Sequence, residues 1–179
     1  MTGDSLRGVA TLTQVSRASA PSRLRKAMGR FATGVTIVTT AQRDHVHGMT
    51  ANGVMSVSLD PPLIVVSLGA SRMDELLPQT RRYGISVLGA DQEELATHFA
   101  GRPVEDLAPR FTWWKELPFI EGALAHVGCR VEAIHQAGDH RLWVGRVEHM
   151  EFRDGDPLLF YAGRFGKLRG ADGGPSTPS

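Results

Sequence analysis

The sequence predicts a mainly β fold, an antiparallel β-barrel with added helices. Six or seven segments rich in β-branched and aromatic residues are joined mostly by short turns, which is typical of antiparallel strands. Two helical segments lie between strands in the middle of the chain. A parallel doubly wound sheet would need regular alternation of strands and helices, and this alternation is absent. We therefore expect an antiparallel barrel.

The first elements are expected to be a short helix and two strands. Pro21 and the helix formers that follow it predict a helix over residues 23–31. A strand over residues 34–41 comes next. The charged turn over residues 42–46 joins it, as a hairpin, to a long strand over residues 49–59.

The strand predicted over residues 49–59 alternates with period two, so one of its faces is expected to lie on the core. The core face holds Met49, Ala51, Gly53, Met55, Val57 and Leu59. The other face holds Thr50, Asn52, Ser56 and Ser58, with Val54 as the exception. Short hydroxyls and an amide, in place of Lys and Glu, suit a polar planar ligand lying close to the backbone. An ordinary Thr/Ser-rich strand facing water is the alternative.

Strands and helices share the middle of the chain. The Asp-Pro-Pro sequence at residues 60–62 ends the long strand, because proline cannot donate to the ladder. An apolar, central strand is expected over residues 63–68, and a helix with a serine N-cap over residues 71–77. Another strand over residues 83–88 precedes a second helix over residues 91–101, which opens with an acidic capping signal.

The last part of the domain is expected to return to strands. Residues 102–118 are interpreted as an irregular aromatic segment. Long strands are predicted over residues 123–135 and 140–152, with a hairpin turn between them. A short final strand is expected over residues 158–161.

Length and composition are those of one globular domain: 179 residues, 41% hydrophobic and 22% charged. We expect residues 21–169 to form this domain, between a disordered extension (1–20) and a disordered Gly/Pro/Ser-rich tail (170–179). The balance of 20 basic and 19 acidic residues indicates neither nucleic acid nor a membrane surface as a partner. Cys129 is the only cysteine, which excludes an internal disulfide and fits a cytoplasmic protein.

Several common active-site signatures are absent from the sequence. It contains no Rossmann G-x-G-x-x-G, no P-loop, no G-x-S-x-G and no H-E-x-x-H. His45 and His47 lie two apart near a hairpin turn without a third ligand nearby, so we expect no metal there.

Two segments could nevertheless carry a binding site. At residues 67–72 a strand gives way to a helix, and the free amides, Ser71 and Arg72 together suit a phosphate. The alternative is a capped helix with a surface arginine. The hairpin turn before His140 places an imidazole at the start of a strand, where it could orient an anion or a nicotinamide. The alternative is a solvated turn histidine.

Five segments occur in the order and spacing of the flavin reductase-like domain family: FATGVTIVTT, HGMTANG, SVSLDPPL, AGDHRLWVGRV and LLFYAGRF. Over about residues 24–168 the chain resembles the small reductase components of two-component flavin-dependent monooxygenases. The resemblance implies an FMN-binding split β-barrel with Greek-key-like connections. It also implies a homodimer that binds FMN or FAD near the subunit interface.

The resemblance also implies site residues, position by position. The flavin ring and ribityl chain are expected to be lined by Thr33, Gly34, Val35, Thr36, Thr50, Ala51, Asn52, Gly53, Ser56, Val57, Ser58, Ser67, Leu68 and Gly69. Ser71 and Arg72 are expected to hold the phosphate, and Phe99 to touch the flavin. The nicotinamide is expected to lie against His47, Gly48, Met49, His140, Tyr161, Gly163 and Arg164.

The implied activity is that of an NAD(P)H:flavin oxidoreductase. It would transfer a hydride from NADH or NADPH to FMN or FAD, and supply reduced flavin to a partner monooxygenase. No protein group is expected to act as a nucleophile or acid–base catalyst; His140 would position the nicotinamide. The alternatives are a non-catalytic flavin-binding carrier or sensor, and a split-barrel flavin oxidase acting on a small molecule. The choice of flavin and of pyridine nucleotide stays open.

Overall fold

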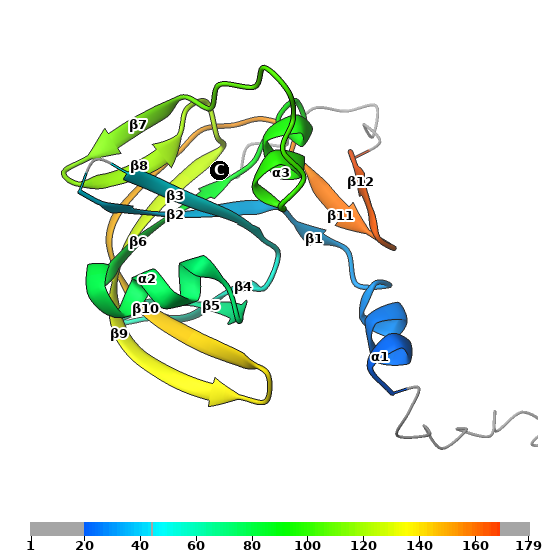
Figure 1. Ribbon diagram of the computed structural model, residues 1–179, viewed down its shortest axis with the longest axis horizontal. Helices are drawn as coiled ribbons and strands as arrows, with labels where there is room; N and C mark the ends of the chain where they lie inside the picture. The colour runs from blue at the N-terminus through cyan, green and yellow to red at the C-terminus, as the bar shows by residue number, and fades with distance from the viewer. Residues whose placement is uncertain (1–19, 44, 169–179) are drawn as a thin grey trace, which may run out of the picture.

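The computed structural model describes residues 20–43 and 45–168, which form a mainly β domain with three helices (Figure 1). The strands of the main sheet are β2 (Thr36–Gln42), β3 (His45–Ala51), β4 (Val54–Leu59), β5 (Pro62–Gly69), β6 (Arg82–Val87), β9 (Ala125–Ala137) and β10 (His140–Phe152). They pair antiparallel in the order β3-β2-β6-β9-β10-β5-β4. The predicted antiparallel fold is confirmed, and the unclosed ring of strands is that of a split barrel.

Two small sheets and three helices complete the described part of the chain. One sheet has the order β1-β11-β12, from β1 (Thr33–Gly34), β11 (Leu159–Tyr161) and β12 (Arg164–Gly166). The other is the hairpin of β7 (Phe111–Trp114) and β8 (Leu117–Ile120). The helices are α1 (Ala20–Met28), α2 (Arg72–Thr80) and α3 (Glu93–Phe99).

Helix α2 lies inside the curve of the main sheet and closes the larger of two cores (Figure 1). Its Met73 and Leu77 are fully buried against strands from both halves of the sheet, including Val38 of β2 and Leu68 of β5. The second core lies beneath α3, around Ile37 and Leu158. Among the described residues, no helix combines the length and the apolar character needed to cross a membrane.

The prediction of a single long strand over residues 49–59 is wrong. The chain turns at Asn52 and Gly53, so that β3 pairs with β2 whereas β4 pairs with β5, at opposite ends of the sheet. The predicted core residues Met55, Val57 and Leu59 are 59%, 47% and 89% exposed, while the predicted exception Val54 packs on the core. Periodicity describes a strand's two faces, and it does not reveal which face the fold covers.

Other expectations differ in smaller ways. Residues 102–118 are not irregular throughout, because they include β7 and the start of β8. The strand expected to be central, β5, is second from one end of the sheet, and β12 was not predicted. The two mid-chain helices and the β9–β10 hairpin are confirmed. Apart from Ala20, the predicted extension and tail lie outside the described residues, so their disorder stays a prediction.

Candidate functional site

A hollow of about 900 Å³ gathers segments that are far apart in the sequence. We call it the large hollow; its lining includes Met28, Phe31, Thr33, Gly34, Thr36, Asn52, Gly53, Val54, Met55, Val65, Ser67, Leu142 and Phe160. Six of these residues belong to the predicted flavin set: Thr33, Gly34, Thr36, Asn52, Gly53 and Ser67. The turn between β3 and β4, which interrupts the predicted strand, is therefore part of the wall.

A second hollow, of about 540 Å³, lies between β3, α3 and the start of α2. We call it the α3 hollow; it is lined by His47, Gly48, Met49, Thr50, Ser71, Arg72, His98, Phe99, Ala100 and Gly101. A smaller hollow of about 180 Å³ shares Thr50 with the α3 hollow and Asn52 with the large hollow. Val35 also lines this smaller hollow. The three spaces therefore adjoin; together we call them the groove, and their linings include most of the predicted site residues.

Hydroxyl groups in this groove differ in what they can offer a ligand. The Thr36 hydroxyl donates to the Ala51 carbonyl at 2.7 Å, and the Thr50 hydroxyl donates to the Ala96 carbonyl at 2.7 Å. Both hydroxyl hydrogens therefore bond the protein's own carbonyls and are not available to a ligand. In contrast, Thr33 Oγ1 is buried with no partner among the described residues. A buried polar atom without a partner is costly, so this hydroxyl suits a ligand atom.

Two predicted site glycines lie against rings: Gly48 lines the α3 hollow, whereas Gly69 and its neighbour His140 line none of the three hollows. A Cβ on Gly48 would lie 2.6 Å from the Phe99 ring, so the ring packs directly on the β3 backbone. A Cβ on Gly69 would lie 3.4 Å from His140 Nε2. A side chain at position 48 would therefore force the Phe99 ring to move, whereas a Cβ at position 69 would make only ordinary contact with the His140 ring.

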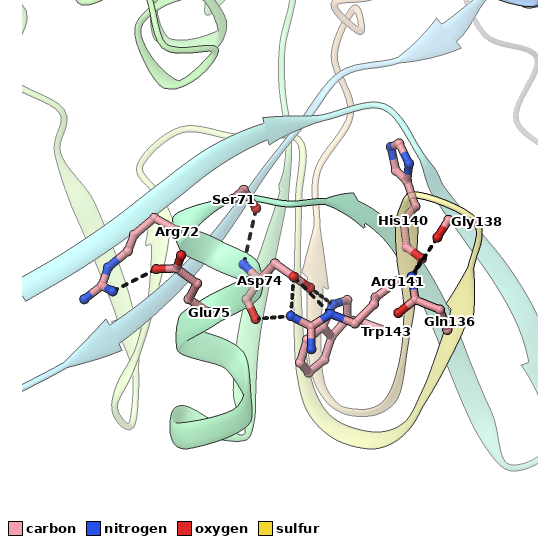
Figure 2. Close-up of polar contacts among 9 residues, drawn as sticks. All are labelled: Ser71, Arg72, Asp74, Glu75, Gln136, Gly138, His140, Arg141 and Trp143. Carbon is pink, nitrogen blue, oxygen red and sulfur yellow. Dashed lines mark hydrogen bonds and ion pairs between the residues drawn. The ribbon is translucent and has the colours of Figure 1, made fainter. Parts of the chain in front are cut away.

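The start of α2 is a capped helix with a surface arginine, which is the alternative that the sequence left open beside a phosphate site. Ser71 Oγ accepts a hydrogen bond from the Asp74 amide at 3.3 Å. Arg72 Nη1 lies 3.0 Å from Glu75 Oε2 in an exposed ion pair (Figure 2). Burial, together with the charge of Arg72, lowers the pKa of the His47 imidazole below its ordinary value. An anion beside Arg72 would relieve this repulsion.

Asp74 connects the start of α2 to β10, and the sequence did not single it out (Figure 2). Its carboxylate is buried; Oδ2 accepts from Arg141 Nε at 3.0 Å and Oδ1 accepts from Trp143 Nε1 at 2.9 Å. Arg141 directly follows His140. The Asp74 carboxylate therefore joins the first turn of α2 to the strand that begins at His140. In the sequence, Asp74 is simply an aspartate in the first turn of a predicted helix. Such a position does not indicate that its carboxylate pairs with an arginine of a distant strand.

His140 stands at the beginning of β10, opposite Gly69 of β5. Its side chain is 46% exposed, and its Nδ1 lies 2.9 Å from Asp139 Oδ1. The hydrogen bond from His140 holds the pKa of the Asp139 carboxyl below its ordinary value. The imidazole thus has one nitrogen engaged and the other, Nε2, beside the end of β5.

Some predicted residues are not brought to the groove as side chains. Ala51 and Leu68 are buried in the core, so only their backbone can reach a ligand. Ser56, Val57 and Ser58 lie along β4 and line none of the three hollows. Tyr161, Gly163 and Arg164 also line none of them and belong to the β11–β12 hairpin, whose Phe160 does line the groove. The sequence did not predict Phe160, because one apolar residue in a strand carries no ligand signal.

Most of the domain matches a known family: residues 28–169 fit the flavin reductase like domain. The chain belongs to this family. It is 55% identical over 152 residues to an NADH-dependent flavin reductase of Rhodococcus sp, covering 83% of this chain and 86% of that protein. It is 40% identical over 148 residues to the reductase component of 4-hydroxyphenylacetate 3-monooxygenase of Thermus thermophilus, covering 80% of this chain and 94% of that protein.

Solved structures of the flavin reductase-like family share the fold. The NADH:FAD oxidoreductase SgcE6 of Streptomyces globisporus, in complex with NAD and FAD fragments, aligns with a TM-score of 0.81. It is 32% identical to this flavin reductase-like chain, and the alignment covers 89% of this chain and 99% of that one.

The groove of this flavin reductase-like domain fits a flavin. The large hollow offers apolar walls from Val54, Val65 and Leu142, and its lining also includes Thr33, whose buried hydroxyl has no partner among the described residues. Binding sites of this kind are mostly apolar with a few placed polar groups. The α3 hollow adds Ser71 and Arg72 at a helix N-terminus, which suits a phosphate.

Proposed function

We propose that this protein is an NAD(P)H:flavin oxidoreductase that transfers a hydride from a reduced nicotinamide to FMN or FAD. The observation that carries the proposal is the set of adjoining hollows, which includes apolar walls in the large hollow and the cationic start of α2 in the α3 hollow. The name of the Rhodococcus relative supports NADH as the hydride donor. Family membership supports a flavin as the acceptor.

The protein's contribution is to bind and orient the reactants, because the hydride-accepting chemistry resides in the flavin ring. Thr33 is proposed to bond a polar ring atom, and Phe99, packed on Gly48, to limit the access of water. Ser71 is proposed to donate its free hydroxyl hydrogen to the phosphate, while its oxygen continues to cap α2.

Arg72 can reach a phosphate at little cost. Its present partner is Glu75, and the two side chains are 61% and 65% exposed. An exposed pair of this kind contributes about 0–1 kcal/mol. Charge-assisted hydrogen bonds from guanidinium to phosphate are stronger and often bidentate. Exchange of Glu75 for a phosphate is therefore favourable, and it leaves the rest of α2 in place.

His140 is proposed to position the nicotinamide. Its Nδ1 faces Asp139, so the Nδ1 hydrogen is directed to a carboxylate and Nε2 is left as the free group beside Gly69. A ring held in this way can bond the carboxamide of the donor and limit its rotation. No proton transfer by His140 is needed, because the hydride moves with its electron pair.

We also propose that a second copy of the chain completes the site. Helix α1 has no buried residue, and Met28, Phe31 and Met55 are 58%, 70% and 59% exposed although they line the large hollow. Strand β4 ends the main sheet and offers an exposed apolar edge, with Leu59 89% exposed. A homodimer that covers α1 and β4 would bury these side chains and wall the groove.

The product is proposed to be free reduced flavin, which a partner monooxygenase consumes. The name of the Thermus relative, a reductase component of a monooxygenase, supports such a partner. A cytoplasmic location fits this role and the single cysteine.

A direct assay tests the activity. Purified protein is mixed with NADH or NADPH and with FMN or FAD, and the nicotinamide absorbance band is followed. We expect loss of the band that depends on both protein and flavin. Flavin binding without any loss of either nucleotide would overturn the reductase proposal and leave a carrier or sensor.

A further inference from the structure

The α3 hollow contains a hydrogen-bond donor that lies outside the predicted flavin set, the imidazole of His98. This half-buried side chain stands in the last turn of α3 and lines the hollow together with Ser71 and Arg72. Its Nδ1 accepts a hydrogen bond from the Val104 amide at 3.2 Å. Because a backbone N–H can only donate, Nδ1 carries no hydrogen in this contact, and the hydrogen of the neutral ring is on Nε2.

The Nε2 hydrogen of His98 is available to a ligand. Within residues 20–43 and 45–168, Val104 is the only hydrogen-bond partner of the His98 side chain. Nε2 is also not among the fully buried polar atoms that lack a partner in this part of the chain, so it is accessible. An accessible N–H on the lining of a hollow is a donor that a bound molecule can use.

The turn after α3 holds the imidazole in one orientation. The His98 carbonyl accepts from the Gly101 amide at 3.3 Å, and the side chain accepts from the Val104 amide, so both bonds close the same turn. The Phe99 ring stands edge-on to the imidazole, with the ring centroids 5.2 Å apart, and itself packs on Gly48. A donor that is already fixed loses little conformational freedom when it binds a ligand.

The other polar groups on the lining indicate which chemical group this donor meets. Arg72 supplies a guanidinium, and Ser71 supplies a hydroxyl whose hydrogen is not used in capping α2. A guanidinium, a hydroxyl and an imidazole N–H all present hydrogens to the same space. Such a set suits an anion with several acceptor oxygens, and a phosphate has this form.

We propose that His98 Nε2 donates a hydrogen bond to the phosphate of the flavin in the α3 hollow, as a binding residue additional to Ser71 and Arg72. The inference deepens the proposed function and rests on it. The phosphate is common to FMN and FAD and is absent from riboflavin. The contact therefore favours phosphorylated flavins over riboflavin, and it involves no transfer of a proton.

Two substitutions separate the roles of the two ring nitrogens of His98. In His98→Asn the amide lies near the position of Nδ1 and can still accept from Val104, but no group reaches the position of Nε2. In His98→Gln the longer side chain reaches the position of Nε2 and can donate an N–H there. Glu94→Gln is the control, because Glu94 is exposed on the same helix and lines none of the three hollows.

Titration calorimetry with FMN and with riboflavin measures the contact. We expect the wild-type protein to bind FMN about tenfold or more tightly than riboflavin. His98→Asn is expected to raise the Kd for FMN about tenfold, because one hydrogen bond to a charged group is lost, and to leave the Kd for riboflavin unchanged. His98→Gln and Glu94→Gln are expected to keep the Kd for FMN within about threefold of the wild-type value.

An unchanged Kd for FMN in His98→Asn overturns the inference. Equal increases for FMN and riboflavin also overturn it, since they would assign His98 only to the turn after α3. A loss of FMN affinity in His98→Gln as large as that in His98→Asn contradicts a donor at the Nε2 position.

NADH also carries phosphates, so its Kd is measured in parallel. An increase for NADH in His98→Asn without an increase for FMN overturns the assignment to the flavin. The proposed reductase function is tested separately, because it depends on the wild-type protein alone. Failure of the wild-type protein to oxidise NADH or NADPH with either FMN or FAD would refute that function, whatever the His98 variants bind.

Discussion

Replacement of Asp74 with alanine probes the link between α2 and β10. The change removes the acceptor of two hydrogen bonds, from Arg141 Nε at 3.0 Å and Trp143 Nε1 at 2.9 Å. A second Arg141 nitrogen, Nη2, also contacts this carboxylate. After the substitution, a partly buried guanidinium and a buried indole N–H lack their partner.

The expected loss of stability follows from burial. Removing one member of a buried ion pair costs about 3–5 kcal/mol. Because Arg141 is 34% exposed, while Asp74 is 9% exposed, water recovers part of this cost. The indole that loses its acceptor adds about 1–3 kcal/mol. We therefore expect Asp74→Ala to lower the free energy of unfolding by about 3 kcal/mol. Asp74→Asn, which retains an acceptor for Trp143, should lower it by about half as much.

Urea denaturation at one fixed protein concentration measures these losses. With a slope of about 2 kcal/mol/M for a domain of this size, Asp74→Ala should lower the midpoint by about 1.5 M. Glu75→Ala is the matched control, since it removes the neighbouring carboxylate from an exposed pair and should cost under about 1 kcal/mol. A loss for Asp74→Ala no greater than that of the control would refute the inferred role of the buried carboxylate.

Two further predictions concern the nicotinamide position and acid stability. In steady-state assays, His140→Ala should raise the KM for NADH about two- to tenfold, because one hydrogen bond to the donor is lost. In binding assays, the Kd for flavin should stay nearly unchanged. An equal increase in the KM for NADH and in the Kd for flavin would indicate that His140 has a structural role. The Arg82 guanidinium beside Glu148 holds the pKa of that carboxyl below its ordinary value of 4.5. The stabilisation is therefore present above about pH 4.5 and is lost as the pH falls through the lowered pKa. Glu148→Gln should lower the thermal midpoint at pH 7, and its deficit should shrink on acidification; a constant deficit down to pH 3 would contradict this.

The sequence predicted most of the groove because five segments occur in the order and spacing of the flavin reductase-like family, and the site residues were carried over from that resemblance. The resemblance to the family implied Thr33, Asn52 and Ser67, and all three line the large hollow. Hydroxyl donors were harder to judge. Thr36 and Thr50 have the same chemistry as Thr33, yet their hydrogens bond the Ala51 and Ala96 carbonyls. Whether a hydroxyl is free depends on which carbonyl the fold places beside it.

The sequence by itself determined the fold class, the positions of most strands and turns, and the family. These follow from side-chain period, turn residues and residue order, which are properties of neighbouring positions. The tertiary structure alone decided that residues 49–59 divide between two ends of one sheet. It also decided that Asp74 meets Arg141. Strand pairing and buried ion pairs join residues distant in the chain, and period within one segment carries no information on which partner the fold selects.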